Sequence, residues 1–358
     1  MGCQSLLFAL LAGCPLLAQD TYFKEPERKW WLPTWELNGW HDDVDRGPGR
    51  SAIIRDRVRL RLRWQIGEDD GWIQFRAGSA SYLGSDGNRF NLSRFDNEPS
   101  NGSLLDLAEI RIQGLGAKGG AEIHGGLVEN GLMSTESLWD PDLRVIGGFG
   151  RAFLRSPEGL FDELGIRATV GDARLLEGGR VAVTAVQGIA KFTTGPVSWT
   201  FFGGPWNMKA RPQDLTKFHR QNPLTDPEYY DVAINFPLTT YGAAISNSTG
   251  LPFEIKAQRH TNRNTHDEGG ELQVFLGSRT RKWIPQVGWV RQVMGLSSQL
   301  ASVNGDIWWF HANADGYRYI AALPLPKKWL VQGSYINQRL RGAKDPVKMY
   351  RVDVFKRF

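Results

Sequence analysis

Residues 54–66 read "IRDRVRLRLRWQI". From Arg55 to Arg63 an arginine occupies every second position, and apolar residues fill the alternate positions from Val58 to Ile66. Period-two alternation predicts a β-strand, because successive side chains leave a strand on opposite faces. Two folds accommodate such a strand. In a sandwich the arginines would face water, whereas in a membrane barrel they would face a wet lumen and the apolar residues would face lipid.

The first twenty residues, "MGCQSLLFALLAGCPLLAQD", have an apolar core and carry no charge before Asp20. This stretch is too short for a spanning helix and resembles a secretory signal peptide over 1–19, cleaved near Ala18 or Gln19. An alternative is a lipoprotein signal, "LAGC" at 11–14, with Cys14 lipidated. Both cysteines, Cys3 and Cys14, lie in this leader. The domain expected over 20–358 therefore has no disulfide and no thiol chemistry.

The composition favours a barrel. Hydrophobic residues make up only 41% of the chain, yet it contains 14 Trp, 18 Phe and 9 Tyr. A barrel with a polar interior and aromatic girdles needs this combination. After the leader no run of apolar residues is long enough for a spanning helix. The alternative is a Trp-rich soluble sandwich. The net charge of +5 is mild, and we find no signature of nucleic-acid binding.

Alternating segments separated by Gly, Pro, Asn and Asp clusters recur to the end of the chain. Examples are "WIQFRAGSA" (72–80), "RVAVTAVQG" (180–188) and "YRYIAALPL" (317–325). No amphipathic helix of ordinary length intervenes. At about 10 residues per tilted strand plus connections, the chain predicts an all-β transmembrane antiparallel β-barrel of about 16 strands, with a range of roughly 14–18.

The last segment strengthens the barrel prediction. Tyr350, Val352, Val354 and Phe358 share one face of an alternating strand that ends on the aromatic Phe358. This resembles the C-terminal signature of bacterial outer-membrane barrels. In a barrel the last strand must pair with the first, because lipid cannot satisfy open backbone groups. Lys356 departs from the apolar pattern, but near an interface a lysine can extend its amine to water.

Residues 136–150, "ESLWDPDLRVIGGFG", resemble a stretch of a family of Gram-negative porins that is distantly similar to phosphate-selective porins and alginate-export barrels. The specific part is 139–144, and the remaining segments follow in the expected order. The resemblance implies a β-barrel porin of the outer membrane, without a settled substrate. We expect a passive diffusion channel for small hydrophilic or anionic solutes, in which pore width and lumen charge determine what passes. The partners expected are outer-membrane lipid, the barrel-assembly machinery and, as an open alternative, further copies of the chain.

The arginine row allows two interpretations. Five arginines facing lipid would each cost about 2–4 kcal/mol near the midplane, so a barrel must turn them inward. Left uncompensated, they would favour anions in a pore. Alternatively, carboxylates on neighbouring strands, such as Glu109 or Asp106, neutralise the row and stiffen the wall. Alternation places Glu109 and Arg111 on one face of their own strand. The pore-lining residues expected are Arg55, Arg57, Arg59, Arg61, Arg63, Glu109 and Arg111.

The segment 129–163 is too long for a tight turn. We expect it to fold into the lumen and narrow the pore, with Trp139, Asp140, Asp142 and Arg144 in the constriction. The alternative is an external loop or a strand pair, since "DPD" at 140–142 is also an ordinary turn signal.

We expect no catalytic site, no metal and no cofactor. "RHTNRNTHDEGG" (259–270) contains possible metal ligands, but its spacing matches no strong motif, and a solvated hairpin is favoured. The tryptophans Trp30, Trp31, Trp35, Trp40, Trp308, Trp309 and Trp329 are expected in interfacial girdles, with sugar stacking as the alternative. Two other functions remain open: a secreted or lipid-anchored sandwich that binds carbohydrate, and a polysaccharide-export barrel.

Overall fold

The computed structural model describes residues 34–47, 53–68, 71–86, 102–156, 161–174, 180–210, 234–247, 249–305 and 307–358. The expected leader (1–19), with Cys14, lies outside these residues, as do Trp30 and Trp31. The strands are β1 (Thr34–Asp45), β2 (Ile53–Ile66), β3 (Ile73–Asp86), β4 (Gly102–Gly116), β5 (Gly119–Glu129), β6 (Arg144–Leu154), β7 (Glu163–Arg174), β8 (Arg180–Thr194), β9 (Val197–Ala210), β10 (Ile234–Asn247), β11 (Phe253–Asn262), β12 (Glu268–Gly277), β13 (Gln286–Met294), β14 (Ala314–Leu325), β15 (Trp329–Leu340) and β16 (Val347–Arg357).

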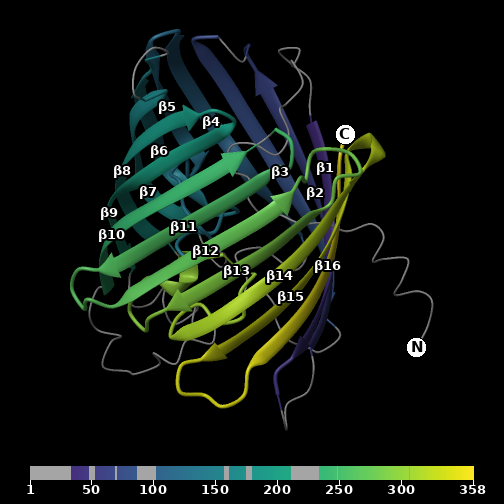
Figure 1. Ribbon diagram of the computed structural model, residues 1–358. Coiled ribbons are helices and arrows are strands. Elements are labelled where there is room, and N and C mark those ends of the chain that lie inside the picture. Colours follow the sequence, from purple (N-terminus) through teal and green to yellow (C-terminus); the bar gives the residue numbers. More distant parts are fainter. Residues whose placement is uncertain are drawn as a thin grey trace.

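These strands form one closed antiparallel barrel in which each strand pairs with its neighbours in sequence. The ring closes between β1 and β16, which pair from Glu36 with Arg357 to Asp45 with Lys348. Figure 1 shows the tilted strands wrapping around one enclosed space. The prediction of about 16 strands is confirmed. A sandwich of two layers is excluded, because a closed ring has no second sheet to pack against.

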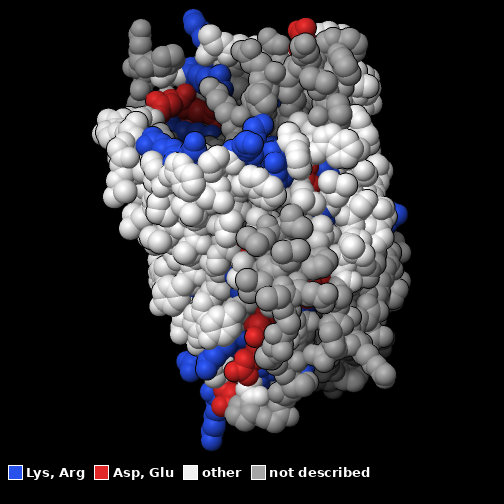
Figure 2. All heavy atoms as spheres, turned by 90° about the vertical axis from the view of Figure 1, so that its right-hand side faces the viewer, with Lys and Arg blue, Asp and Glu red and all other residues white. Residues whose placement is uncertain are grey.

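The two faces of the wall have opposite character. On β2 the side chains of Arg55, Arg57, Arg59 and Arg61 are buried, whereas Ile54, Leu60, Trp64 and Ile66 are exposed. Figure 2 shows mainly uncharged atoms across the middle of one outer face, with charged side chains gathered toward its two ends. A water-soluble protein would have the reverse arrangement. Apolar residues outside and polar residues inside are the features of a transmembrane barrel.

The two ends of the barrel differ in their connections. At one end, which we call the turn end, the strands are joined by short segments such as 117–118, 195–196 and 326–328. At the other, the loop end, the connections include 87–101, 211–233 and 295–313. Transmembrane barrels have short periplasmic turns and long extracellular loops. The loop end therefore corresponds to the extracellular side.

Two of the loop-end connections fold back into the barrel. One is the segment 130–143 between β5 and β6, which we call the inward loop; the other is 295–313 between β13 and β14, the second inner loop. The second contains the short 3-10 helix η4 (Ala301–Val303). Among the described residues no helix is long and apolar enough to cross a membrane.

The segment 129–163 is not one long loop as expected. Only 130–143 is irregular, and Arg144–Leu154 forms β6 between β5 and β7. The glycines of "RVIGGFG" concealed this strand, because glycine is unfavourable in strand interiors. Here they permit close approach to β7: a Cβ on Gly147 would lie 2.2 Å from the carbonyl oxygen of Val170. Arg144 consequently belongs to the wall and not to the loop.

Candidate functional site

The inward loop crosses the interior and is hydrogen-bonded to strands on several sides. On β7 and β8, Arg167 donates to the carbonyl of Gly131 over 2.7 Å, and Gln187 accepts from the amide of Met133 over 2.8 Å. On β11, Lys256 donates to the carbonyl of Ser134 over 2.8 Å. These contacts satisfy loop backbone groups that would otherwise be buried without partners. The loop therefore has a defined course within the lumen.

Further along, the loop reaches the remaining sides of the barrel. The amide of Ser137 donates to Glu271 on β12 over 3.1 Å, and Arg318 on β14 lies 3.3 Å from the carboxylate of Glu136. The loop then returns to β2, where Asp142 accepts from two of the arginines. A chain that touches β7, β11, β14 and β2 in turn divides the interior of the barrel.

An apolar anchor holds the inward loop against β6 to β10. Leu132, Leu138, Trp139 and Leu143 are almost fully buried in one cluster with inward residues of these strands. Trp139 lies against Trp206 of β9, with ring centroids 5.9 Å apart. Burial of a tryptophan contributes several kcal/mol to holding a segment in place. Trp139 thus serves as the anchor of the inward loop. The polar end of the loop, at Asp142, faces β2.

The second inner loop lies against the first. The amide of Asp140 donates to the carbonyl of Val303, and the amide of Gly305 donates to the carbonyl of Glu136, each over 2.7 Å. Trp308 and Phe310 pack in a cluster with inward residues of β12 to β16 and of β1. Gln338 of β15 fixes the loop by accepting from the amide of Phe310 over 2.6 Å. Among the connections that the structure describes, two loops and not one therefore narrow the interior.

The arginine row of β2 is extensively paired. Arg55 lies 2.8 Å from Asp42, Arg61 lies 3.0 Å from Asp106, and Arg63 lies 2.6 Å from Glu129. Arg57 lies over the ring of Trp40, 5.1 Å from its centroid. Among the described residues, the arginine network comprises Arg55, Arg57, Arg59, Arg61, Arg63, Arg144 and Arg351 with Glu36, Asp42, Asp106, Glu129, Asp142 and Asp353.

Asp106 is the centre of this arginine network. Its carboxylate lies within 3.3 Å of Arg61, Arg63 and Arg144. Strict alternation would place Asp106 on the opposite face from Glu109. A β-bulge between β3 and β4 changes the register at Gly78 and Ser79, which pair with Leu107 and Leu105. The extra residue is Asp106, and the bulge directs it inward, as bulges do at functional positions.

Asp142 joins the inward loop to the arginine row. Its carboxylate accepts from Arg59 over 3.1 Å and from Arg61 over 2.9 Å, and its side chain is 11% exposed. Burial alone would raise the pKa of Asp142, but the charges of Arg59, Arg61 and Arg144 outweigh burial and lower the pKa to about 2. The carboxylate therefore stays ionised at any physiological pH.

Other residues expected from the sequence lie as follows. Glu109 is buried and pairs with Arg76 over 2.7 Å, while Arg111 pairs with Glu122 on β5. Arg144 donates to the carbonyl of Pro141 over 2.9 Å and so fixes the end of the inward loop to the wall. Asp140 is buried in the loop. Tyr350 and Val352 of β16 are exposed, as is Phe358 directly after this strand, whereas Val354 of β16 is buried.

Several interior groups were not identified from the sequence. Glu36 and Asp42 of β1 and Asp353 of β16 meet the arginine row only because β1 closes the ring between β2 and β16. Alternation in "WELNGWHDD" (35–43) was the available signal, but Gly39 and the adjacent polar residues obscured it. Glu136 could not be assigned, since its partner Arg318 is 182 positions away.

The girdle interpretation holds for some tryptophans only. Trp35 is exposed on the outer wall, and Lys356 lies over the Trp329 ring, 4.7 Å from its centroid. Trp40 instead faces inward between Arg57 and Arg351, and Trp308 and Trp309 belong to the interior. Trp308 and Trp309 lie in the second inner loop, which packs inside the barrel. Residues 259–270 form the β11–β12 hairpin, as favoured.

The chain shares its fold with solved porin structures. A structure of Salmonella typhi OmpF in complex with daunomycin matches with a TM-score of 0.53 and 11% identity, over 92% of this chain and 97% of that chain. The high-pH structure of Pseudomonas putida OprB matches with a TM-score of 0.56 and 10% identity, over 92% and 94%. No family model and no curated protein matches the chain.

These likenesses confirm the sequence-based resemblance at the level of the fold. A transmembrane β-barrel with an apolar outer face, short turns at one end and long loops at the other is a structure of outer membranes. The chain is therefore an outer-membrane β-barrel with the architecture of porins.

Proposed function

We propose that this barrel is a passive diffusion channel for small hydrophilic solutes across the outer membrane. The observation that carries the proposal is the inward loop, which crosses a polar lumen and faces the arginine row of β2 through Asp142. A barrel that served only as a membrane anchor would need no charged interior. Pore width and lumen charge would set which solutes pass. The proposal involves no covalent chemistry.

We assign the narrowest part of the path to Arg61 and Asp142, whose side chains are 7% and 11% exposed, with Arg59 fully buried beside Asp142. Trp139 and Asp140 would hold the loop in position. Arg55, Arg57, Arg63, Glu109 and Arg111 would line the wall on either side. Removing charges of one sign from this narrow part of the path changes the ratio of anions to cations that enter.

A mild anion preference is the finer part of the proposal. Within the arginine network the guanidinium groups slightly outnumber the carboxylates, and Asp106 is shared by three of them. The extensive pairing supports the interpretation of the row as a wall-stiffening network. It leaves only a small positive excess to act on permeating ions.

Planar-bilayer conductance in a KCl gradient tests the channel and its ion preference together. The wild-type protein should form open channels with a reversal potential displaced toward the anion value. Arg61→Gln should move that potential toward the cation value. Arg180→Gln is the matched control, because Arg180 pairs with Asp172 outside the lumen and its side chain is 61% exposed. An unchanged reversal potential in Arg61→Gln would contradict the anion preference, and absence of any conductance would contradict the channel.

A further inference from the structure

The two inner loops cover one side of the lumen. The inward side chains of β11 to β13 are buried at their level, as in Gln258, His260, Gln273 and Gln292. Gln258 accepts from the amide of Thr135 in the inward loop, and Asn262 donates to the carbonyl of Ser297 in the second inner loop over 2.7 Å. By contrast, the side chains of Arg76 and Arg111, inward residues nearer the turn end, are each 21% exposed. Passage along β11 to β14 therefore requires the loops to move.

One residue of the wall contacts both loops. The guanidinium group of Arg318 on β14 faces both carboxylate oxygens of Glu136 in the inward loop, over 3.3 and 3.5 Å. The same group lies over the ring of Trp308 in the second inner loop, 5.7 Å from its centroid. Arg318 is only 2% exposed, so these contacts are shielded from water and their electrostatic attraction is strengthened. Arg318 is thus a shared point of attachment for the two loops.

Glu136 also joins the loops to each other. Its carbonyl accepts from the amide of Gly305 over 2.7 Å, and the carbonyl of Val303 accepts from the amide of Asp140 over the same distance. The two backbones approach so closely that a Cβ on Gly305 would lie 2.8 Å from the Cβ of Glu136. Movement of Glu136 away from Arg318 would therefore carry the second inner loop with it.

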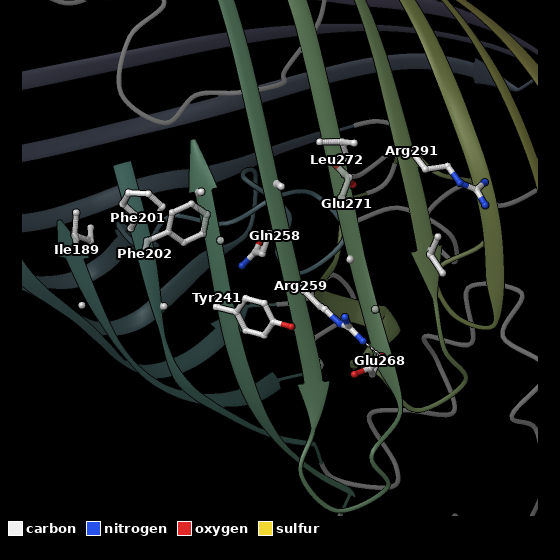
Figure 3. A pocket seen from close by; sticks show the side chains of 18 of the residues that line it. Ile189, Phe201, Phe202, Tyr241, Gln258, Arg259, Glu268, Glu271, Leu272 and Arg291 are labelled. Carbon is white, nitrogen blue, oxygen red and sulfur yellow. Dashed lines mark hydrogen bonds and ion pairs between the residues drawn. The ribbon is translucent and has the colours of Figure 1, made fainter. Parts of the chain in front are cut away.

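A second carboxylate competes for Arg318. Glu271 of β12 lies in register with Gln258 of β11, and Figure 3 shows both on these adjacent strands. Glu271 accepts from the amide of Ser137, next to Glu136, over 3.1 Å. The charges of Glu136 and Arg318 both act on the Glu271 carboxylate. Two carboxylates that repel each other thus share the attraction of one guanidinium group.

The inward loop is consequently attached unequally at its two charged ends. At one end, Asp142 accepts from Arg59 and Arg61 over 3.1 and 2.9 Å. At the other, Glu136 has longer contacts with Arg318 and lies beside a competing carboxylate. Charge-assisted hydrogen bonds weaken with distance from their optimum near 2.7–2.9 Å. The Glu136 end is therefore the one that detaches first.

We propose that Glu136 and Arg318 form a latch between two conducting states of the channel. In the latched state both inner loops cover β11 to β14, and solutes pass beside the arginine row of β2. Release lets residues 134–137 and the second inner loop move off these strands, while Trp139 and Asp142 hold the rest of the inward loop. Arg318 is a positioning residue, because it acts through the loops. The latch rests on the proposed channel function and adds its regulation.

Single-channel recordings of the full chain in planar bilayers, at fixed voltage, test the latch through the occupancy ratio of high- to low-conductance states. Glu136→Gln should raise this ratio about tenfold or more, corresponding to roughly 1.4 kcal/mol. Glu271→Gln should lower it, because Arg318 then attracts Glu136 alone while the glutamine oxygen still accepts from Ser137. Asp315→Asn is the control: it removes a carboxylate from β14 that pairs with Arg291 on the outer wall, and should leave the ratio unchanged.

Two further variants separate the ion pair from a general effect on packing. Arg318→Met should raise the ratio, and Arg318→Lys, which keeps the charge, should partly restore it. Adding Glu136→Gln to Arg318→Met should produce little further change, because both substitutions remove the same ion pair. Heat-modifiable gel migration shows whether each barrel is folded; if Arg318→Met is not, the two glutamate variants decide.

An unchanged ratio in folded Glu136→Gln would overturn the latch. A rise in both Glu136→Gln and Glu271→Gln would also overturn it, since that result indicates general loosening of the interior. Absence of any current from the folded wild-type protein would instead contradict the channel function itself.

Discussion

At the scale of single residues, the interior is organised by a few shared carboxylates. Asp106 accepts three arginines from two different strands, and Asp142 joins the inward loop to Arg59 and Arg61. Removing one member of a buried charge network leaves its partners uncompensated and costs about 3–5 kcal/mol. Exposed pairs contribute about 0–1 kcal/mol. The two kinds of pair therefore respond very differently to the same substitution.

Asp106→Asn should destabilise the barrel strongly, because the buried Arg61 and Arg144 and the partly buried Arg63 lose their shared partner. We expect a loss of about 3 kcal/mol or more in the free energy of unfolding. Urea unfolding in detergent micelles measures it. Asp172→Asn is the matched control, since Asp172 is 42% exposed and pairs only loosely with Arg180 at 3.8 Å. Equal destabilisation by the two substitutions would show that Asp106 does not organise the interior.

The low pKa of Asp142 predicts the pH response of the loop. Because the folded-state pKa, about 2, is below the ordinary value of 3.8, the ion pairs with Arg59 and Arg61 stabilise the loop fully above pH 4. This contribution is lost as the pH falls from 4 toward 2. The part of the acid response that depends on Asp142 should therefore appear in the single-channel conductance and its noise only below pH 4. Asp142→Asn should remove that acid transition; a transition retained in this variant would assign it to another group.

At the scale of elements, alternation predicted the strands and their inward faces well where it was unbroken, as in β2 and β8. It could not predict the bulge that turns Asp106 inward, because a bulge depends on the pairing of two strands. It missed β6, whose glycines weaken the strand signal while allowing close contact with β7. The second inner loop was also missed, since its apolar side chains are explained only by the interior they fill.

Shortening the inward loop should widen the path through the barrel. Glu129 and Arg144 pair directly across the base of the loop, so a short Gly-Ser turn can replace residues 131–142 without stretching the wall. We expect single-channel conductance to rise by about twofold or more, because the narrowest part of the path sets the current. Replacing 264–266, the exposed tip of the β11–β12 hairpin, is the control and should leave conductance unchanged. Unaltered conductance in the loop variant would mean that the loop does not limit the path.

At the scale of the whole molecule, closure of the ring explains the opposite faces of every strand. Pairing of β1 with β16 removes the open edges that lipid could not satisfy and encloses the charged residues in one lumen. The sequence predicted closure from the alternation, the terminal strand and the composition together. The sequence could not predict which carboxylate pairs with which arginine in the interior, because these ion pairs depend on where the inward loop and the second inner loop fold.

The central claim is that the arginine face of β2 points into the lumen and that its apolar face points toward lipid. Cysteine accessibility along β2 tests this claim most directly. The chain has no cysteine after Cys14, so Arg61→Cys and Leu60→Cys each place one thiol in the wall. In a planar bilayer, a water-soluble methanethiosulfonate reagent should react with the Arg61→Cys protein and reduce its current, and should leave the Leu60→Cys protein unchanged. Reaction at position 60 with none at position 61 would place the arginine face outside and contradict the account.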